Sequence, residues 1–212
     1  FSFKCWALGY VSLKFANQHF TVDYHFIFFD KVPAFEACNK VCVADAEAAS
    51  IAAKAIIQAK KKKILGLFGN PELLITQKRQ QSFMEQIALG TDPVPVTIRY
   101  ASSSKDAMQQ VVQSLESENK PDAIFCMSDE LLTGAMKALL VKKCKVPEEV
   151  GVISICNNGF IPSLFEPEIT YVETSGFELG KLAVKRIFDH MGGKTFVQEL
   201  ILPSRLVNGH SL

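Results

Sequence analysis

Two short polar clusters each follow an apolar run that has the composition of a buried strand. Ser128 and Asp129 follow one such run, and Asn157 and Asn158 follow the next one along the chain. In an open α/β sheet, ligands bind outside the carboxyl ends of the strands, so both clusters are expected at one small-molecule site. Hydroxyl and amide groups can both donate and accept hydrogen bonds, which suits a polar ligand.

Each of these residues also has a purely structural interpretation. Ser128 and Asp129 precede a predicted helix and could satisfy its first free N–H groups. Asn157 and Asn158 stand before Gly159, and Asn and Gly supply the positive φ angles that turns need. At this point both roles stay open for each of the four residues.

The elements that must position these clusters alternate between strands and helices from residue 45 onward. The predicted strands are residues 25–30, 64–69, 94–100, 122–127, 151–156, 169–173 and 196–202. The predicted helices are residues 46–60, 73–89, 104–117, 130–143 and 176–191. Continuous apolar strands that alternate with helices predict an α/β protein with a doubly wound parallel sheet. Residues 1–24 show no clean strand or helix period, and no element is assigned to them.

Composition limits the classes of protein. A chain of 212 residues with 48% hydrophobic residues can bury a full core. Its formal net charge of +1 cannot hold DNA or an anionic membrane without a dedicated basic module. The apolar N-terminal run is broken by Lys4 and Lys14, so neither a leader peptide nor a membrane span is predicted. Six cysteines without a CxxC pair are typical of free, buried thiols in a cytoplasmic protein.

Enzyme, metal and cofactor chemistry is not expected. The four histidines have no metal-ligand spacing, and the sequence has no dinucleotide-binding, Walker or nucleophile-elbow motif. A catalytic site at Ser128, Asp129 and Asn157 would lack the His, Lys or metal that activates a nucleophile. The run from Lys60 to Lys63 is interpreted as the solvated end of a helix, where cations complement the helix dipole.

The order of several further segments resembles the effector-binding domain of the LacI/GalR transcription factors. These segments are KPDAIFCMSD (120–129), TGAMKAL (133–139), VPEEVGVISI (146–155), PEITYV (167–172), ELG (178–180) and LPSRLV (202–207). The resemblance covers roughly residues 25–212. It implies a two-lobed fold like that of the periplasmic sugar-binding proteins, with doubly wound parallel sheets and an effector between the lobes. It also implies a helix-turn-helix headpiece at the amino terminus, which this sequence lacks.

The resemblance also implies where the lobes lie along the chain. Residues 1–60 are expected to form part of the first lobe, and helix 176–191 is expected to return to it. Residues 61–173 and 194–212 are expected to form the second lobe. The first lobe is expected to be incomplete, because the family places more βαβ units before the strand matched by residues 64–69 than this chain offers.

Effector contacts are implied in the same way. Gln77 takes the place of the Arg that grips the effector in the family, and Ser128 takes the place of an Asn beside Asp129. Asn157 replaces an Asp, and Thr174 lies where many relatives place an aromatic wall. Each departure removes a charge or a ring, and neutral groups bond less strongly than charged pairs. We therefore expect a small neutral metabolite or a sugar, with a phosphorylated or anionic ligand as the alternative.

The function expected from this resemblance is that of a regulator. The chain would be the ligand-sensing and dimerisation domain of a LacI-type repressor, whose headpiece binds operator DNA. Apolar side chains in helix 130–143 and loop 159–165 predict part of a homodimer interface. The alternative is a transport-type periplasmic sugar-binding protein, which would predict a leader peptide and few free thiols. The expected partners are a small effector, a second copy and operator DNA, with no membrane and no cofactor.

Overall fold

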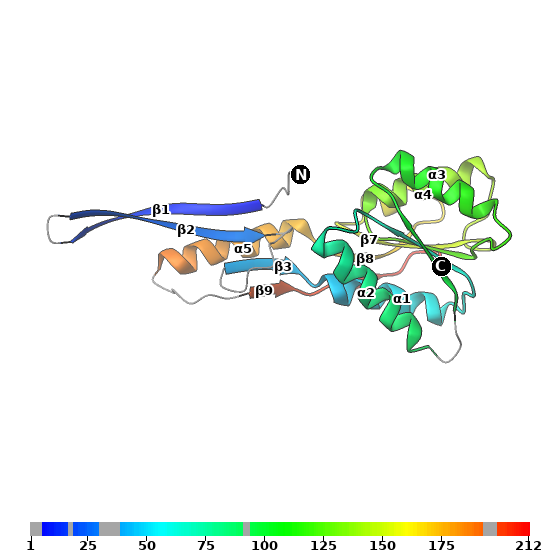
Figure 1. Ribbon diagram of the computed structural model, residues 1–212, viewed down its shortest axis with the longest axis horizontal. Helices are drawn as coiled ribbons and strands as arrows, with labels where there is room; N and C mark the ends of the chain where they lie inside the picture. Colours follow the sequence, from blue (N-terminus) through cyan, green and yellow to red (C-terminus); the bar gives the residue numbers. More distant parts are fainter. Residues whose placement is uncertain (1–5, 17–18, 30–38, 91–93, 193–198) are drawn as a thin grey trace. The chain divides into compact units, whose positions relative to one another are not determined.

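A computed structural model of the chain describes residues 6–16, 19–29, 39–90, 94–192 and 199–212, with side chains from residue 26 onward (Figure 1). The chain divides into two compact units. Unit 1 comprises Phe1–Val43 and Gly176–Leu202, and unit 2 comprises Ala44–Ser175 and Pro203–Leu212. Within the described ranges, no helix has the length and apolar character needed to cross a membrane.

Unit 2 is built on a six-stranded sheet with the order β10-β8-β7-β6-β4-β5. Its strands are β4 (Ile64–Phe68), β5 (Val96–Tyr100), β6 (Ala123–Cys126), β7 (Gly151–Cys156), β8 (Thr170–Glu173) and β10 (Arg205–Val207). Strands β4 to β8 are parallel, and β10 pairs with β8 in the antiparallel sense. The predicted parallel α/β sheet is confirmed, since the apolar runs found in the sequence are strands buried on both faces.

Helices cover both faces of this sheet (Figure 1). Helices α1 (Asp45–Gln58) and α2 (Leu74–Ala88) pack against each other on one face, and α3 (Ser104–Leu115) and α4 (Asp129–Val141) pack against each other on the other face. Helices α3 and α4 approach so closely that a Cβ atom on Gly134 would lie 2.1 Å from the Ser104 carbonyl oxygen. Only glycine permits this crossing, which sets the position of α4 and of the residues at its start.

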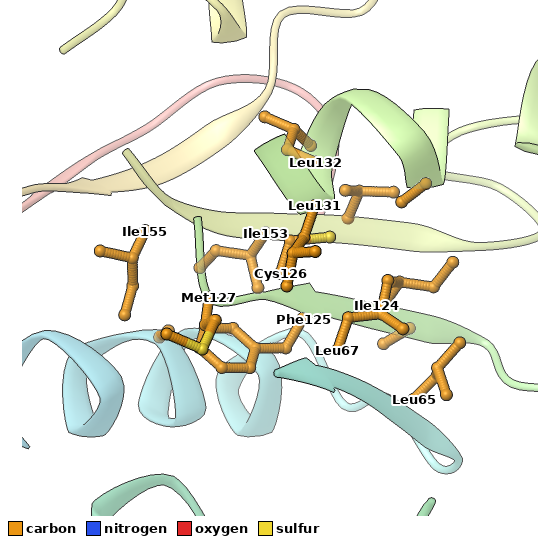
Figure 2. Close-up of a cluster of buried hydrophobic side chains, with 14 of the residues drawn as sticks. Leu65, Leu67, Ile124, Phe125, Cys126, Met127, Leu131, Leu132, Ile153 and Ile155 are labelled. Carbon is orange, nitrogen blue, oxygen red and sulfur yellow. The ribbon is translucent and has the colours of Figure 1, made fainter. Parts of the chain in front are cut away.

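The core of unit 2 is centred on β4, β6 and β7, and Figure 2 shows their side chains packed with those of α4. Three fully buried aromatic residues, Phe68, Phe83 and Phe125, form a cluster at the face of α2. The rings of Phe83 and Phe125 are stacked with centroids 4.4 Å apart, and Phe68 meets Phe125 edge-on at 5.5 Å. Aromatic pairs in these arrangements add to the stabilisation from burial alone.

Unit 1 contains a four-stranded sheet with the order β1-β2-β3-β9. Its strands are β1 (Trp6–Ala16), β2 (His19–Phe29), β3 (Asn39–Val43) and β9 (Glu199–Leu202). Strands β1 and β2 form a long antiparallel hairpin, and β3 pairs in parallel with both β2 and β9. This hairpin covers most of residues 1–24, to which the sequence analysis assigned no element. The prediction missed it because strand pairing along a hairpin does not require a regular alternation of apolar and polar residues.

Helix α5 (Gly176–Met191) packs on the unit 1 sheet, where Leu179 and Ala183 meet Ile27 and Val41. Arg186 is also buried on this side, and its guanidinium donates to Asn39 Oδ1 at 2.7 Å. This hydrogen bond joins the helix to the start of β3 and supplies a partner for a buried charge.

The boundaries of the two units differ from the expected lobes at two places. Residues 1–60 were expected to lie together, yet α1 belongs to unit 2, because Ala48, Ala49 and Ala52 are fully buried in the unit 2 core. Residues 194–212 were expected in the second lobe, yet β9 belongs to unit 1, because it pairs with β3. Neither difference could be predicted from the order of the elements along the chain, since each helix or strand packs into the core that buries its apolar side.

The structure describes four cysteines, Cys42, Cys126, Cys144 and Cys156. Three of them are buried, whereas Cys144 is partly exposed. Burial raises the pKa of the Cys126 thiol above its ordinary value, so this group stays protonated and unreactive. Cys5 and Cys38 lie outside the described residues.

Candidate functional site

The carboxyl ends of the parallel strands in unit 2 lie along one edge of the sheet, here called the carboxyl edge. The predicted residues that directly follow these strand ends are Ser128, Asp129, Asn157, Asn158 and Thr174. The strands β6, β7 and β8 are neighbours in the sheet, so the fold brings these five residues to adjacent positions. The sixth, Gln77, lies in the first turn of α2, which follows β4.

Asp129 is the first residue of α4, and its carboxylate spans the gap to the next strand. Asp129 Oδ2 accepts a hydrogen bond of 2.9 Å from the backbone N–H of Asn157, which joins the start of α4 to the end of β7. The other oxygen, Oδ1, is buried and accepts no hydrogen bond from any N–H or O–H group of the described residues. A buried carboxylate oxygen without a donor is costly, so Oδ1 is a prepared acceptor at the carboxyl edge.

The thiol of Cys156 lies beside this carboxylate. Burial and, secondly, the negative charge of Asp129 raise the pKa of Cys156 above its ordinary value. The protonated thiol donates a hydrogen bond to the Asp129 carboxylate, although a thiol is a weaker donor than an O–H or N–H group.

Ser128 is the N-cap of α4. Its backbone is extended, and its hydroxyl oxygen accepts from the backbone N–H of Leu131 at 3.4 Å. The capping interpretation of Ser128 therefore holds in the structure, and the half-buried hydroxyl keeps its own proton for a further acceptor.

The remaining predicted residues make mostly local hydrogen bonds. Asn158 Oδ1 accepts from the Phe160 N–H at 2.9 Å, which is the turn role considered from the sequence. The Thr174 hydroxyl donates to the Cys156 carbonyl at 3.3 Å, and exposed Gln77 donates to the Pro71 carbonyl at 3.0 Å. The Asn157 side chain is exposed next to Asp129. Of the six predicted residues, Asp129 alone presents a buried polar atom that lacks an N–H or O–H donor among the described groups.

A second buried polar atom of this kind is found on Thr76, which the sequence analysis missed. Thr76 Oγ1 is buried without a hydrogen-bond partner among the described residues, and it lies beside Gly69, just past the end of β4. Its Oγ1 would be 3.5 Å from a Cβ atom on Gly69, an ordinary van der Waals distance. Two unsatisfied oxygens, one acceptor and one hydroxyl, therefore lie at the carboxyl edge.

Arg79 is the other residue that the sequence analysis missed. It is buried, and its Nε and Nη2 atoms lie 2.8 and 2.7 Å from Asp45 Oδ1 at the start of α1. Its Nη1 donates to the Met127 carbonyl at 2.5 Å, directly before Ser128. The guanidinium thus ties α1, α2 and the end of β6 together. A signal was present in the sequence, since Arg79 occupies the same helical face as the buried Phe83 and Ile87.

Within the described ranges, no group of three or more His, Cys, Asp or Glu side chains could hold a metal ion. The polar groups at the carboxyl edge are instead suited to hydrogen bonding with an organic molecule. A parallel sheet with polar side chains gathered at this edge is typical of α/β ligand-binding domains.

The chain belongs to the family of periplasmic binding protein-like domains, whose sequence profile matches residues 53–212. Its resemblance to the LacI/GalR effector-binding domain is confirmed by its relatives. The transcriptional repressor MelR of Bacillus subtilis (strain 168) is 28% identical over 135 residues, which cover 63% of this chain and 38% of that repressor. The repressor PurR of Mannheimia succiniciproducens is 25% identical over 157 residues, which cover 73% of this chain and 47% of that protein.

The chain spans less than half the length of these two relatives, which are transcriptional repressors and not enzymes. A LacI family transcriptional regulator from Enterococcus faecium, solved with bound ribose, has the same fold with a TM-score of 0.79. The two are 19% identical, and the match covers 87% of this chain and 69% of that structure. The predicted periplasmic-binding-protein-like fold class is thereby confirmed.

Proposed function

We propose that this chain is the effector-binding and dimerisation part of a cytoplasmic LacI-type transcriptional regulator. A small polar metabolite at the carboxyl edge of unit 2 would control operator binding by a helix-turn-helix headpiece outside these 212 residues. The observation that carries the proposal is the buried Asp129 Oδ1, which lacks an N–H or O–H donor among the described groups. The matched repressors favour a regulator over the alternative, a transport-type sugar-binding protein.

The unsatisfied Asp129 oxygen supports a hydroxylated, neutral effector such as a sugar. Asp129 Oδ1 needs a donor, and a hydroxyl group of the ligand would supply one. The buried cation nearby, Arg79, is already paired with Asp45 and with the Met127 carbonyl. Arg79 therefore has no unpaired positive charge to offer an anionic effector. This favours the neutral ligand over the phosphorylated alternative.

Replacing Asp129 with Asn is expected to weaken binding of the effector by about 1–3 kcal/mol, because the charged acceptor is lost. Binding is measured by thermal shift with millimolar pentoses, hexoses, nucleosides, purine bases and sugar phosphates. A ligand at about 100 times its dissociation constant adds about 2.7 kcal/mol, which raises the melting temperature by several degrees.

The matched control is Glu130→Gln, which removes the same charge from the next residue, an exposed one. It is expected to leave the affinity unchanged. Equal affinity in Asp129→Asn and wild type would place the effector elsewhere, and no shift with any compound of the panel would count against a sugar-type effector.

The proposed homodimer uses exposed apolar side chains of unit 2. Leu140 and Val141 at the end of α4 are 78% and 57% exposed, and Phe160 and Leu164 in the loop after β7 are 66% and 61% exposed. Exposed apolar side chains, where they join into one patch, mark protein–protein interfaces. We expect a dimer at micromolar concentration by light scattering, and a shift toward monomer in Leu140→Lys.

The control for this substitution is Leu89→Lys at the end of α2, where Leu89 is 77% exposed. It makes the same change at another helix end and should leave the dimer intact. A wild-type monomer, or equal dissociation by both variants, would contradict the proposed interface.

A further inference from the structure

Unit 2 contains a cavity of about 450 Å³ that is separate from the carboxyl edge. It lies where β4 begins, along one face of β5 and beside the carboxyl-terminal end of α3. Its polar wall consists of Lys63, Thr97, Arg99, Ser117, Glu118 and Asn119. None of these residues belongs to the site described above. The volume falls within the range of small-molecule sites, which is roughly 300–1,000 Å³.

The face of β5 explains why this cavity is polar. Successive residues of a strand point to opposite faces of the sheet, so Val96 and Ile98 face one side and Thr97 and Arg99 face the other. Val96 and Ile98 pack against the core, whereas Thr97 and Arg99 are exposed. The cavity therefore lies on the side of the sheet that α3 covers only in part.

Two cations at the cavity are left without a counter-charge. The Lys63 backbone N–H donates to Asp122 Oδ1 at 2.8 Å. In the part of the chain that the structure describes, however, neither the Lys63 ammonium nor the Arg99 guanidinium has a hydrogen bond or an ion pair. Glu118 lines the same cavity and pairs with neither of them there.

Other charged side chains of unit 2 have partners. Lys142 pairs with Glu116, two residues before Glu118, and Arg205 pairs with Glu173 at 2.5 Å. The run from Lys60 to Lys63, read from the sequence as a solvated helix end, leads directly into the cavity.

We propose that this cavity binds a small hydroxylated anion, either a carboxylate or a phosphate ester. The anionic group lies between Lys63 and Arg99, since a guanidinium presents paired N–H donors to carboxylate and phosphate oxygens. The hydroxyl groups of the ligand face Thr97, Ser117 and Asn119, and one of them donates to Glu118. The carboxylate of Glu118 repels ligands that carry several separated negative charges, which sets a preference for one anionic group per molecule.

The test measures binding of gluconate and glucose 6-phosphate to the full chain by calorimetry, with glucose as the neutral counterpart of both. The double variant Lys63→Gln/Arg99→Gln is expected to bind at least one of the anions about tenfold or more weakly than wild type, as expected for the loss of charge-assisted hydrogen bonds. The Asp129→Asn variant should keep this affinity, because it alters only the carboxyl edge.

The control is Lys54→Gln on α1, which removes one positive charge from an exposed position of the same unit. It should bind the anions as wild type does. The proposal is overturned if neither anion binds at millimolar concentration, if the double variant binds as well as wild type, or if Lys54→Gln weakens binding equally. Loss of binding in Asp129→Asn would assign the anions to the carboxyl edge and would likewise overturn it. Melting temperatures without ligand verify that every variant is folded.

Discussion

Replacing Arg79 with Met is expected to destabilise unit 2 by about 3–5 kcal/mol, because it removes one partner of a buried ion pair. The side chain of Asp45 is only 11% exposed and would lose the guanidinium as its counter-charge. The Met127 carbonyl would lose its buried donor as well. Because this carbonyl directly precedes Ser128 and Asp129, the substitution should also weaken effector binding at the carboxyl edge.

Urea denaturation followed by circular dichroism measures the loss of stability. The double variant Asp45→Asn/Arg79→Met should be more stable than Arg79→Met alone, because the carboxylate that has lost the guanidinium is also neutralised. The control is Arg205→Met. Arg205 also pairs with a carboxylate, but its side chain is 75% exposed, so this change should leave the midpoint nearly unchanged. Equal effects of Arg79→Met and Arg205→Met would show that the buried pair has no special role.

Replacing Phe125 with Ala is expected to cost about 3–5 kcal/mol of stability, because a fully buried ring is lost and a cavity remains. The stacked ring of Phe83 and the edge-on ring of Phe68 would both lose their partner. Phe125 lies one residue before the end of β6, so repacking here would also disturb the start of α4. Phe125→Leu keeps most of the volume and should cost less than about 1.5 kcal/mol.

The same denaturation experiment tests this prediction. Phe188→Ala on α5 is the matched control, because Phe188 is 66% exposed and its ring fills no core. It should change stability by less than about 0.5 kcal/mol. A loss in Phe125→Ala as small as that in Phe188→Ala would mean that the aromatic cluster does not hold unit 2 together.

Most elements of unit 2 could be predicted from the sequence, with the exception of β10 (Arg205–Val207). The runs 122–127 and 151–156 correspond to β6 (Ala123–Cys126) and β7 (Gly151–Cys156), because parallel strands buried on both faces have continuous apolar sequences. The cap at Ser128 was also foreseeable, since capping depends on residues only three positions apart.

The function of particular side chains was harder to predict. The sequence indicated which strand ends carry polar groups, but it did not separate the groups that bond locally from those left open. Asn158 and Thr174 have short-range partners, whereas the Asp129 carboxylate reaches the backbone of Asn157, 28 positions away. Arg79 escaped notice because its two partners, Asp45 and Met127, lie 34 and 48 positions away along the chain.

The sequence by itself therefore determined the type and order of most elements of unit 2, its parallel sheet and the edge at which the polar clusters lie. These properties depend on hydrophobic periodicity and on local capping, which act over a few neighbouring residues. The tertiary structure alone decided which unit takes α1 and β9, where Arg79 finds its partners and which oxygens remain unsatisfied. These outcomes depend on contacts between segments that are distant in the sequence. The hydrophobic pattern of one segment does not indicate which other segment it will pack against.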